Sequence, residues 1–337
     1  MDLDLILDAR ASADALAEQG QFAEGLGFSG IWVSSLLDGR DAFANLSVLA
    51  RSTQRIAIGV IAVNPWDMHP VKISAALHTL NELSRGRARI VIGGGGEALA
   101  ALGLKPVRRV RAVRETVEII KRAATGERRD YRGELYQALG YGLGWLTAAA
   151  PAVYVGANME QMLRMAGRVA DGIMLSDLPP KLAAAAIQTA SVAAGKSAGK
   201  APGEFWSSAF TAWHVYPDLD KARLEAKRWL LLRGLFRPWV LADFLEQQEI
   251  EQVMNNQAAF EQAFVTGNGV IDGVPDSIID KLIAHLTLTA SSTSLDHVVR
   301  ELMAYKTAGL STLSLRLYEQ PMTSMELLAS ELMPQLT

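Results

Sequence analysis

The feature that most constrains the fold of this chain is a repeated alternation of short apolar runs with helical patterns. Eight runs have the length and composition of strands. Several are apolar throughout, which is typical of parallel strands buried on both faces, whereas strands with one wet face alternate apolar and polar residues. The eight runs are 3–7, 30–33, 56–63, 89–92, 152–155, 172–175, 207–215 and 312–317.

The segments between these runs have the periodicity of amphipathic helices. In residues 107–127 apolar residues recur on one face, with charged residues opposite. The helix predicted over 69–86 begins with Pro70, in the first turn where proline is tolerated, and ends at Gly86. Strands that alternate with helices in this way predict the α/β class.

Two segments interrupt the alternation. Residues 126–150 predict a small hairpin that turns at Arg132-Gly133, and residues 218–310 are too long for one crossover and predict several helices. No repeat or linker divides the 337 residues, so we expect one domain over 1–337. Eight βα-like units favour a (β/α)8 TIM barrel with insertions, notably the helical one in 218–310; a doubly wound open sheet is the alternative.

Composition excludes several classes of protein. The formal charge is −3 with acids and bases interspersed, which provides no footprint for nucleic acid or an anionic membrane. The chain has no cysteine, which excludes disulfides, thiolate metal sites and a cysteine nucleophile and suits a cytoplasmic protein. No apolar run reaches the roughly 18 residues of a spanning helix, and the N-terminus lacks the features of a secretory signal. We therefore expect a soluble cytoplasmic protein.

Residues with special backbone requirements follow the third and fourth runs, where parallel α/β proteins gather their functional groups. The third run ends in Asn64-Pro65-Trp66, and the fourth in four glycines, 93–96, and then Glu97. The second segment fits G-x-G-x-x-A, but a dinucleotide site is disfavoured because this is the fourth strand and no acidic residue ends a following strand at the right spacing. Two alternatives stay open: a loop that needs positive φ, or a loop against which a flat ring packs, with Glu97 beside it.

Other motifs carry less weight. Residues 195–199 match G-x-S-x-G but follow a helix, so the strained turn that exposes a catalytic serine is not expected. The five histidines have no metal-ligand spacing, and no metal site is expected. Trp32 and Trp66 fall at or just beyond strand ends, where they either fill the core or form a wall of a ligand site.

Four segments together resemble the bacterial luciferase-like superfamily, and within it the deazaflavin-dependent branch that includes methylenetetrahydromethanopterin reductase. "AVNPWDMHP" is similar to that branch's V-x-N-P…H-P segment, and "GGGGEALAALG" resembles its glycine-rich loop ending in an acid. "LGFSGIWVSS" and the Ala-Gly…Ala-Asp-Gly signature in 151–175 add to the resemblance. It covers residues 1–180 well and the C-terminal half loosely.

The resemblance implies a TIM barrel that binds a flavin or deazaflavin at the carboxyl ends of its strands. It places Ile61 and Ala62 in a bulge that backs the ring, often through a cis peptide bond, and Glu97 as an acid near the ring. It further assigns cofactor contacts to Asn64, Gly95, Gly156, Ala157 and Asn158.

One departure from the family concerns the catalytic base. Relatives often have Asp-His after the second strand, where this chain has Ser35-Leu36, so the histidine base of an alcohol oxidation is missing. Hydride transfer itself is the cofactor's chemistry and is not affected. Candidate substrate contacts are Trp32, Ser35 and Trp66.

The resemblance leads us to expect an oxidoreductase that transfers a hydride between coenzyme F420 and a small organic substrate, with Glu97 exchanging the proton. An FMN-dependent monooxygenase is the alternative within the enzymes, because both rings present similar edges. A non-catalytic ligand-binding barrel is the alternative outside them. Relatives are commonly dimers, and the apolar segments 229–232 and 236–239 offer an interface, so we expect a homodimer.

Overall fold

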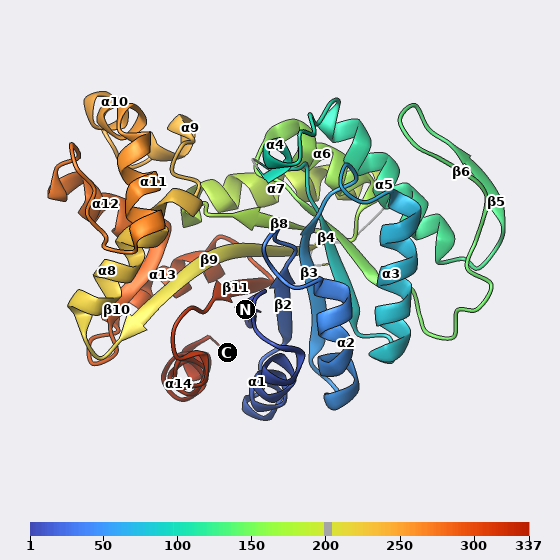
Figure 1. Cartoon of the computed structure of the whole chain (residues 1–337), viewed down its shortest axis with the longest axis horizontal. Coiled ribbons are helices and arrows are strands. Elements are labelled where there is room, and N and C mark those ends of the chain that lie inside the picture. Colours follow the sequence, from blue (N-terminus) through green and yellow to red (C-terminus); the bar gives the residue numbers. More distant parts are fainter. Residues whose placement is uncertain (97, 199–203, 337) are drawn as a thin grey trace.

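Eight parallel strands form a closed ring. The computed structural model describes residues 1–96, 98–198 and 204–336. The strand order is β1-β2-β3-β4-β7-β8-β9-β11, and the ring closes because β11 pairs with β1 while β9 pairs with both β8 and β11 (Figure 1). This confirms the barrel, excludes the open sheet, and makes each predicted strand a member of the ring. The strands are β1 (Asp2–Leu7), β2 (Gly30–Ser34), β3 (Ala57–Val63), β4 (Ala88–Ile92), β7 (Ala152–Gly156), β8 (Gly172–Ser176), β9 (Trp206–Tyr216) and β11 (Thr312–Arg316).

Helices cover the outside of this ring, and their ends carry ordinary capping signals. Ser12 accepts a hydrogen bond from the N–H of Ala15 at the start of α1, and Gly27 ends that helix with φ 89°. Pro70 occupies the first turn of α3, as predicted. The outer helices are α1 (Ala13–Leu26), α2 (Ala42–Ser52), α3 (Pro70–Leu83), the short α4 (Ala98–Ala101), α5 (Arg109–Ala123), α6 (Glu160–Val169), α7 (Pro180–Ala198), α13 (Asp296–Thr307) and α14 (Pro321–Leu327).

The long segment after β9 forms a largely helical insertion, as predicted. It lies to one side of the barrel in Figure 1 and ends in a strand that the sequence did not reveal, β10, which pairs with β9. The ring uses β9 residues 206–212, whereas β10 pairs with residues 212–216, so β9 extends beyond the ring. The insertion comprises α8 (Leu219–Trp229), α9 (Pro238–Leu241), α10 (Gln247–Asn255), α11 (Gln257–Thr266), α12 (Asp276–Leu286) and β10 (Thr287–Ser291).

The predicted hairpin is also present, on the opposite side of the barrel (Figure 1). Strands β5 (Arg129–Arg132) and β6 (Gln137–Tyr141) are antiparallel. The carboxylate of the buried Glu115 on α5 accepts hydrogen bonds from three successive N–H groups of the turn, at 2.9, 3.0 and 2.9 Å. A charged residue on α5 therefore fixes the hairpin to the barrel.

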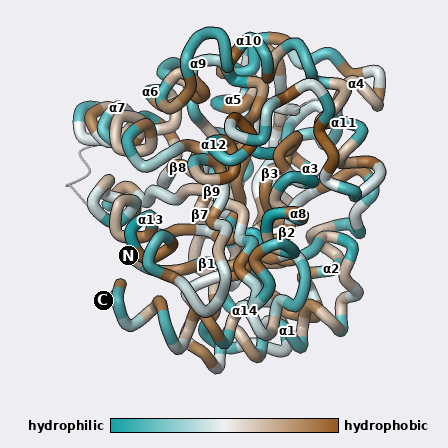
Figure 2. The backbone as a smooth tube through the Cα atoms, turned by 90° about the vertical axis from the view of Figure 1, so that its left-hand side faces the viewer, coloured by the Kyte–Doolittle hydropathy of each residue, from teal (hydrophilic) through white to brown (hydrophobic). Residues whose placement is uncertain are grey.

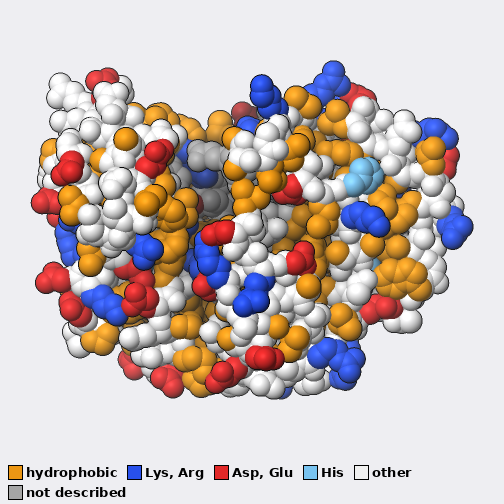
Figure 3. All heavy atoms as spheres, in the orientation of Figure 1, with side chains coloured by type: hydrophobic (Ala, Val, Ile, Leu, Met, Phe, Trp, Pro, Cys, Tyr) orange, Lys and Arg blue, Asp and Glu red, His pale blue; other side chains and the backbone are white. Residues whose placement is uncertain are grey.

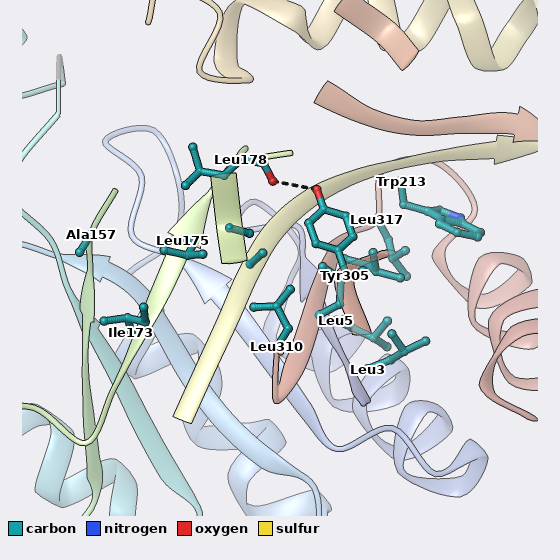
Figure 4. Close-up of a cluster of buried hydrophobic side chains, with 14 of the residues drawn as sticks. Leu3, Leu5, Ala157, Ile173, Leu175, Leu178, Trp213, Tyr305, Leu310 and Leu317 are labelled. Carbon is teal, nitrogen blue, oxygen red and sulfur yellow. Dashed lines mark hydrogen bonds between the residues drawn. The ribbon is translucent and has the colours of Figure 1, made fainter. Parts of the chain in front are cut away.

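A layer of apolar side chains joins the strands to the helices. Leu3 and Leu5 of β1 and Leu310 are among the core residues drawn in Figure 4, and all three are buried. The hydroxyl of the buried Tyr305 on α13 donates to the carbonyl of Leu178 at 2.9 Å (Figure 4). Along the backbone, apolar residues concentrate in the central strands and polar residues in the outer helices (Figure 2). This is the distribution that a barrel buried under helices requires.

The amino-terminal end of the barrel interior holds an ion pair inside an aromatic box. Asp4, with 0% of its surface exposed, lies 3.3 Å from Arg89 and accepts a hydrogen bond from Trp32 Nε1 at 2.8 Å. The Arg89 guanidinium lies over the Trp32 ring, 5.2 Å from its centre. Tyr154 and Trp206, which stack at 4.1 Å, complete the box. This end of a TIM barrel serves stability.

A carboxylate joins the end of α1 to the start of β3. Glu24 accepts hydrogen bonds from the backbone N–H groups of Gln54, Arg55 and Ile56. Burial acts to raise the pKa of Glu24, but these donors and the Arg55 charge outweigh it, so the pKa lies below its usual value. The stabilisation is therefore complete above the unfolded-state pKa and is lost as the pH falls through the folded-state pKa.

We accordingly expect Glu24→Gln to reduce stability at neutral pH and to make it fall less steeply on acidification below about pH 4.5. Urea unfolding at a series of pH values measures this. Glu18, exposed on the same helix, provides the control Glu18→Gln. Parallel pH curves for the wild type and Glu24→Gln would contradict the prediction.

No described helix is long and apolar enough to cross a membrane. No group of three or more histidine, aspartate or glutamate side chains in the described ranges is placed to hold a metal ion.

Candidate active site

A cavity of about 750 Å³ lies at the carboxyl ends of the barrel strands. One wall comes from the loops after β2, β3, β4 and β8, and from β9 and β11, and the other from the insertion. Figure 3 shows the surface hollowed between the insertion and the rest of the molecule. The insertion contributes Trp229, Leu232, Arg233, Arg237 and Phe264.

The end of β3 forms the predicted bulge. Its pairing with β4 shifts register between Val60 and Val63. The side chain of Ile61 is buried in the barrel interior, where it belongs to the cluster around Trp32, whereas Ala62 lines the cavity. The Ser35 N–H donates to the Ile61 carbonyl at 2.6 Å, and Ser35 also lines the cavity.

The prediction of a cis peptide bond between Ile61 and Ala62 is wrong. No peptide bond among the described residues is cis. The register shift alone turns the small Ala62 side chain toward the cavity and keeps Ile61 out of it. Of the two residues expected to back a ring, only Ala62 faces the cavity.

The glycine-rich loop after β4 forms an adjoining part of the wall, because all four of its glycines line the cavity. Gly95 has φ 73°, and a Cβ atom there would lie 2.4 Å from Leu99 Cδ1. A Cβ atom on Gly93 would lie 3.0 Å from that of Ala62. The reading as a loop that needs positive φ is confirmed at Gly95, and the loop also borders the cavity. Glu97 lies outside the described residues.

Asn64 and Trp66 support this wall. Asn64 lines the cavity, but its side-chain oxygen accepts from the N–H groups of Trp66 at 3.1 Å and Asp67 at 3.3 Å, and its amide nitrogen donates to Asp67. The side chain is therefore used in a local turn. Trp66 packs beside Gly95 and is not among the residues that line the cavity.

The segment Gly156, Ala157 and Asn158 lies behind the lining. The Asn158 side chain makes two hydrogen bonds to the backbone of Ser176, at 2.9 and 3.0 Å, and the Ala157 N–H donates to Met174. Ser176 lines the cavity, but the three predicted contact residues do not. Their observed role is to hold the ends of β7 and β8 together.

The structure also places Trp32 away from the cavity. It is fully buried in the aromatic box of the barrel interior, and its indole N–H is bonded to Asp4. The prediction of a substrate contact at Trp32 is corrected for this reason. The alternative that Trp32 fills the core is correct, because its side chain packs in the ring interior with those of Ile6, Ile61, Val91, Tyr154 and Met174.

A buried ion pair that the sequence did not reveal connects the insertion to the barrel. Arg233 and Asp177 are both buried, and their charged groups lie 3.0 Å apart. Burial acts to lower the pKa of Arg233, but Asp177 and Tyr318 raise it above its usual value, so the arginine is charged. Asp177 has φ 52°, an uncommon conformation for a residue other than glycine, at the wall of the cavity.

Arg316 and Tyr318, at the end of β11, form the part of the wall opposite the glycine loop. Arg316 lies 4.9 Å from the Tyr318 ring and donates to the Leu317 carbonyl at 2.7 Å. Tyr318 stacks on His214 at 4.7 Å, and His214 Nδ1 lies 2.6 Å from the Glu225 carboxylate. Burial raises the pKa of Tyr318, so its hydroxyl is protonated at neutral pH.

Asp177, Arg316 and Tyr318 could have been found in the sequence by looking for polar residues at the carboxyl ends of apolar strands. Each follows or ends an apolar strand, and each is polar. The residues from the insertion carry no comparable signal, since several helices there have similar amphipathic patterns. Their place in the cavity depends on how the insertion folds back on the barrel.

The sequence matches the luciferase-like monooxygenase family over residues 3–312. The chain belongs to this family. Among curated members it is 27% identical, over 94% of both chains, to 5,10-methylenetetrahydromethanopterin reductase of Archaeoglobus fulgidus. It is 28% identical to F420-dependent glucose-6-phosphate dehydrogenase of Nakamurella multipartita, over 81% of this chain and 83% of the relative. The predicted resemblance is confirmed, and the relatives include F420-dependent oxidoreductases.

Solved structures of other proteins share the fold. The F420-dependent tetrahydromethanopterin reductase of Methanopyrus kandleri superposes with a TM-score of 0.83 at 21% identity, over 100% of this chain and 99% of the other. The oxygenating component of 3,6-diketocamphane monooxygenase from Pseudomonas putida, in complex with FMN, gives a TM-score of 0.64 at 17% identity, over 99% of each chain. The same fold therefore occurs in a protein described as F420-dependent and in one solved with FMN.

Proposed function

We propose that this protein is an F420-dependent oxidoreductase that transfers a hydride between the deazaflavin ring and a small organic substrate in the cavity. The observation that carries the proposal is a wall of the cavity almost free of side chains, formed by Ala62 and by residues 93–96. Curated relatives whose names include F420 match most of the chain and support the choice of ring.

The residues present fit a flat ring. A side chain at Gly95 would collide with Leu99, and one at Gly93 would press tightly against Ala62. Glycine at these positions leaves space for an aromatic system to approach the backbone. Ala62 and Gly95 would contact the face of the ring, and Asn64 would border it. Gly156, Ala157 and Asn158 would act indirectly, by fixing Ser176. When bound, the deazaflavin supplies hydride transfer.

The chain's own residues would exchange the proton and exclude water from the cavity. We propose Glu97 as the acid or base, because it directly follows Gly96, which lines the cavity. The protonated hydroxyl of Tyr318, which also lines the cavity, offers a second proton donor. Phe210, Trp229 and Phe264 supply an apolar lining that excludes water from the reacting atoms.

We also propose that residues 1–337 act as one domain, in the cytoplasm, without nucleic acid or membrane partners. A homodimer is proposed from the exposed part of Trp239 and the adjacent apolar segment. Ser35 and Trp66 remain candidate substrate contacts. Ser35 lines the cavity, and Trp66 lies beside Gly95, which lines it.

Titration with the two rings tests the proposed function. We expect F420 to bind at micromolar or lower concentration and to quench tryptophan fluorescence, because Trp229 lines the cavity and Trp66 flanks it. FMN is expected to bind more weakly. The control is Trp229→Phe, which should reduce the quenching and retain most of the affinity. Tight FMN binding without a response to F420 would instead favour the flavin monooxygenase.

A further inference from the structure

A basic groove lies beside the cavity, between the first turns of α5 and the adjacent face of α6. Its volume is about 790 Å³. Helices α5 and α6 pack together, and Figure 1 shows them side by side near the mouth of the barrel. Five arginines and one glutamate line the groove, in a chain whose formal net charge is −3. The charged residues are Arg108, Arg109, Arg111, Arg114, Glu134 and Arg168.

Two of these cations have no acidic partner among the described residues. Glu134 binds Arg108 at 3.0 Å and Arg111 at 2.9 Å, and Arg114 pairs with Glu118 along α5. Arg109 and Arg168 are exposed and make no ion pair within the described ranges. Among the described residues, the groove therefore holds more positive charge than acidic side chains neutralise.

The position of these arginines is unfavourable for the helix itself. Arg109 and Arg111 occupy the first turn of α5, which has no acidic residue, although the positive end of a helix dipole favours acids there. Like charges also recur at spacings of three residues along this face, at 108, 111 and 114. An anion bound in the groove would relieve both repulsions. Such local conflicts with helix electrostatics are expected where a site binds a ligand.

The groove lies next to the wall of the cavity at Gly94. Gly94 lines the cavity, and a Cβ atom there would lie 3.8 Å from Arg109 Cδ and 3.4 Å from Met162 Cε. Arg109 lines the groove, whose floor includes Gln161 and Met165 of α6. A ligand whose flat end lies against residues 93–96 can therefore continue past Gly94 onto the arginines.

From the proximity of Gly94 to Arg109 we propose that the groove binds the oligoanionic tail of the coenzyme. The inference rests on the proposed function. Coenzyme F420 carries its ring on a chain with a phosphodiester and terminal glutamate carboxylates, whereas the ring with its ribityl chain alone is uncharged along that part. Arg109 is the first cation that the chain reaches after Gly94, and Arg168 lies farther along the groove on α6. Both act by charge in an open groove, so the contribution depends on ionic strength.

Comparison of two ligands separates this tail site from the ring site. Affinity is measured by tryptophan fluorescence for F420 and for its ring precursor FO, which lacks the phosphate and the glutamates, at low and high salt. F420 should bind more tightly than FO at low salt, and the difference should shrink as salt increases. Arg109→Gln with Arg168→Gln should weaken F420 about tenfold, or about 1.4 kcal/mol, and leave FO unchanged.

The matched control is Arg51→Gln with Arg300→Gln, which removes two exposed arginines from α2 and α13. It changes the net charge equally and should affect neither ligand. All four positions are exposed, and thermal melting checks that each variant is folded. Equal binding of F420 and FO by the wild type, or equal weakening of both by the groove variant, would overturn the tail site and leave the proposed function standing. Failure of both ligands to bind would refute the proposed function itself.

Discussion

Replacing Asp4 by asparagine should lower the free energy of unfolding by about 3–5 kcal/mol, a large part of the total for a typical domain. Asp4 is fully buried, and the side chain of its partner Arg89 is only 12% exposed. The substitution keeps the shape of the side chain but leaves the guanidinium without a counter-charge inside the aromatic box. Denaturant unfolding followed by tryptophan fluorescence measures the loss, and Trp32 reports from the box.

Two variants define the origin of the effect. Asp2→Asn, at the exposed start of the same strand, should change stability by about 0.5 kcal/mol or less. Asp4→Asn combined with Arg89→Met removes both charges, and it should lose less stability than the sum of the two single variants. A loss below about 1 kcal/mol for Asp4→Asn alone would show that the ion pair is not the stabilising element.

The second large effect is expected on catalysis. If Glu97 exchanges a proton at the ring or the substrate, Glu97→Gln should reduce turnover by about 10²–10⁴-fold, with nearly unchanged affinity for the ring. Steady-state kinetics with the F420-reducing or F420H2-oxidising substrate, together with ring titration, measure the two quantities separately.

The alternative for Glu97 is an acid that stabilises the helix that follows it, with a contribution of about 0.3–1 kcal/mol. In that case the substitution would reduce thermal stability without changing turnover. Glu160→Gln provides the control, because Glu160 is an acid in the first turn of α6 whose carboxylate pairs with Arg164. It should affect stability slightly and leave turnover unchanged.

The barrel could be predicted because its strands are buried on both faces. This burial requires continuous apolar runs, and such runs are visible in a single sequence. Strand β10 was missed because its sequence, Thr287–Ser291, is short and half polar, and it pairs only with the extension of β9. The hairpin β5–β6 was found from its turn residues, but the buried Glu115 that holds it lies in the middle of a helix pattern and gave no signal.

The parts of the site that depend on backbone conformation could be predicted from the sequence. Glycine at 93 and 95 is required by close packing and by positive φ, and a proline at 65 marks the end of β3. Side-chain roles were less predictable, because they depend on orientation. Trp32 and Ile61 point into the ring below the cavity, and Asn158 is used to bind Ser176. Arg233 reaches Asp177 only because the insertion folds back on the barrel, across 56 residues of sequence.

Strand β9 extends beyond the ring, so one part of it closes the barrel and another part holds the insertion. Residues 206–212 carry every hydrogen bond by which β9 closes the barrel, and residues 213–216 pair only with β10. Substitutions or changes of length within the insertion can therefore reshape the outer wall of the cavity without opening the ring. In such an arrangement, substrate preference can diverge among related chains while the surface that would hold the coenzyme is inherited unchanged.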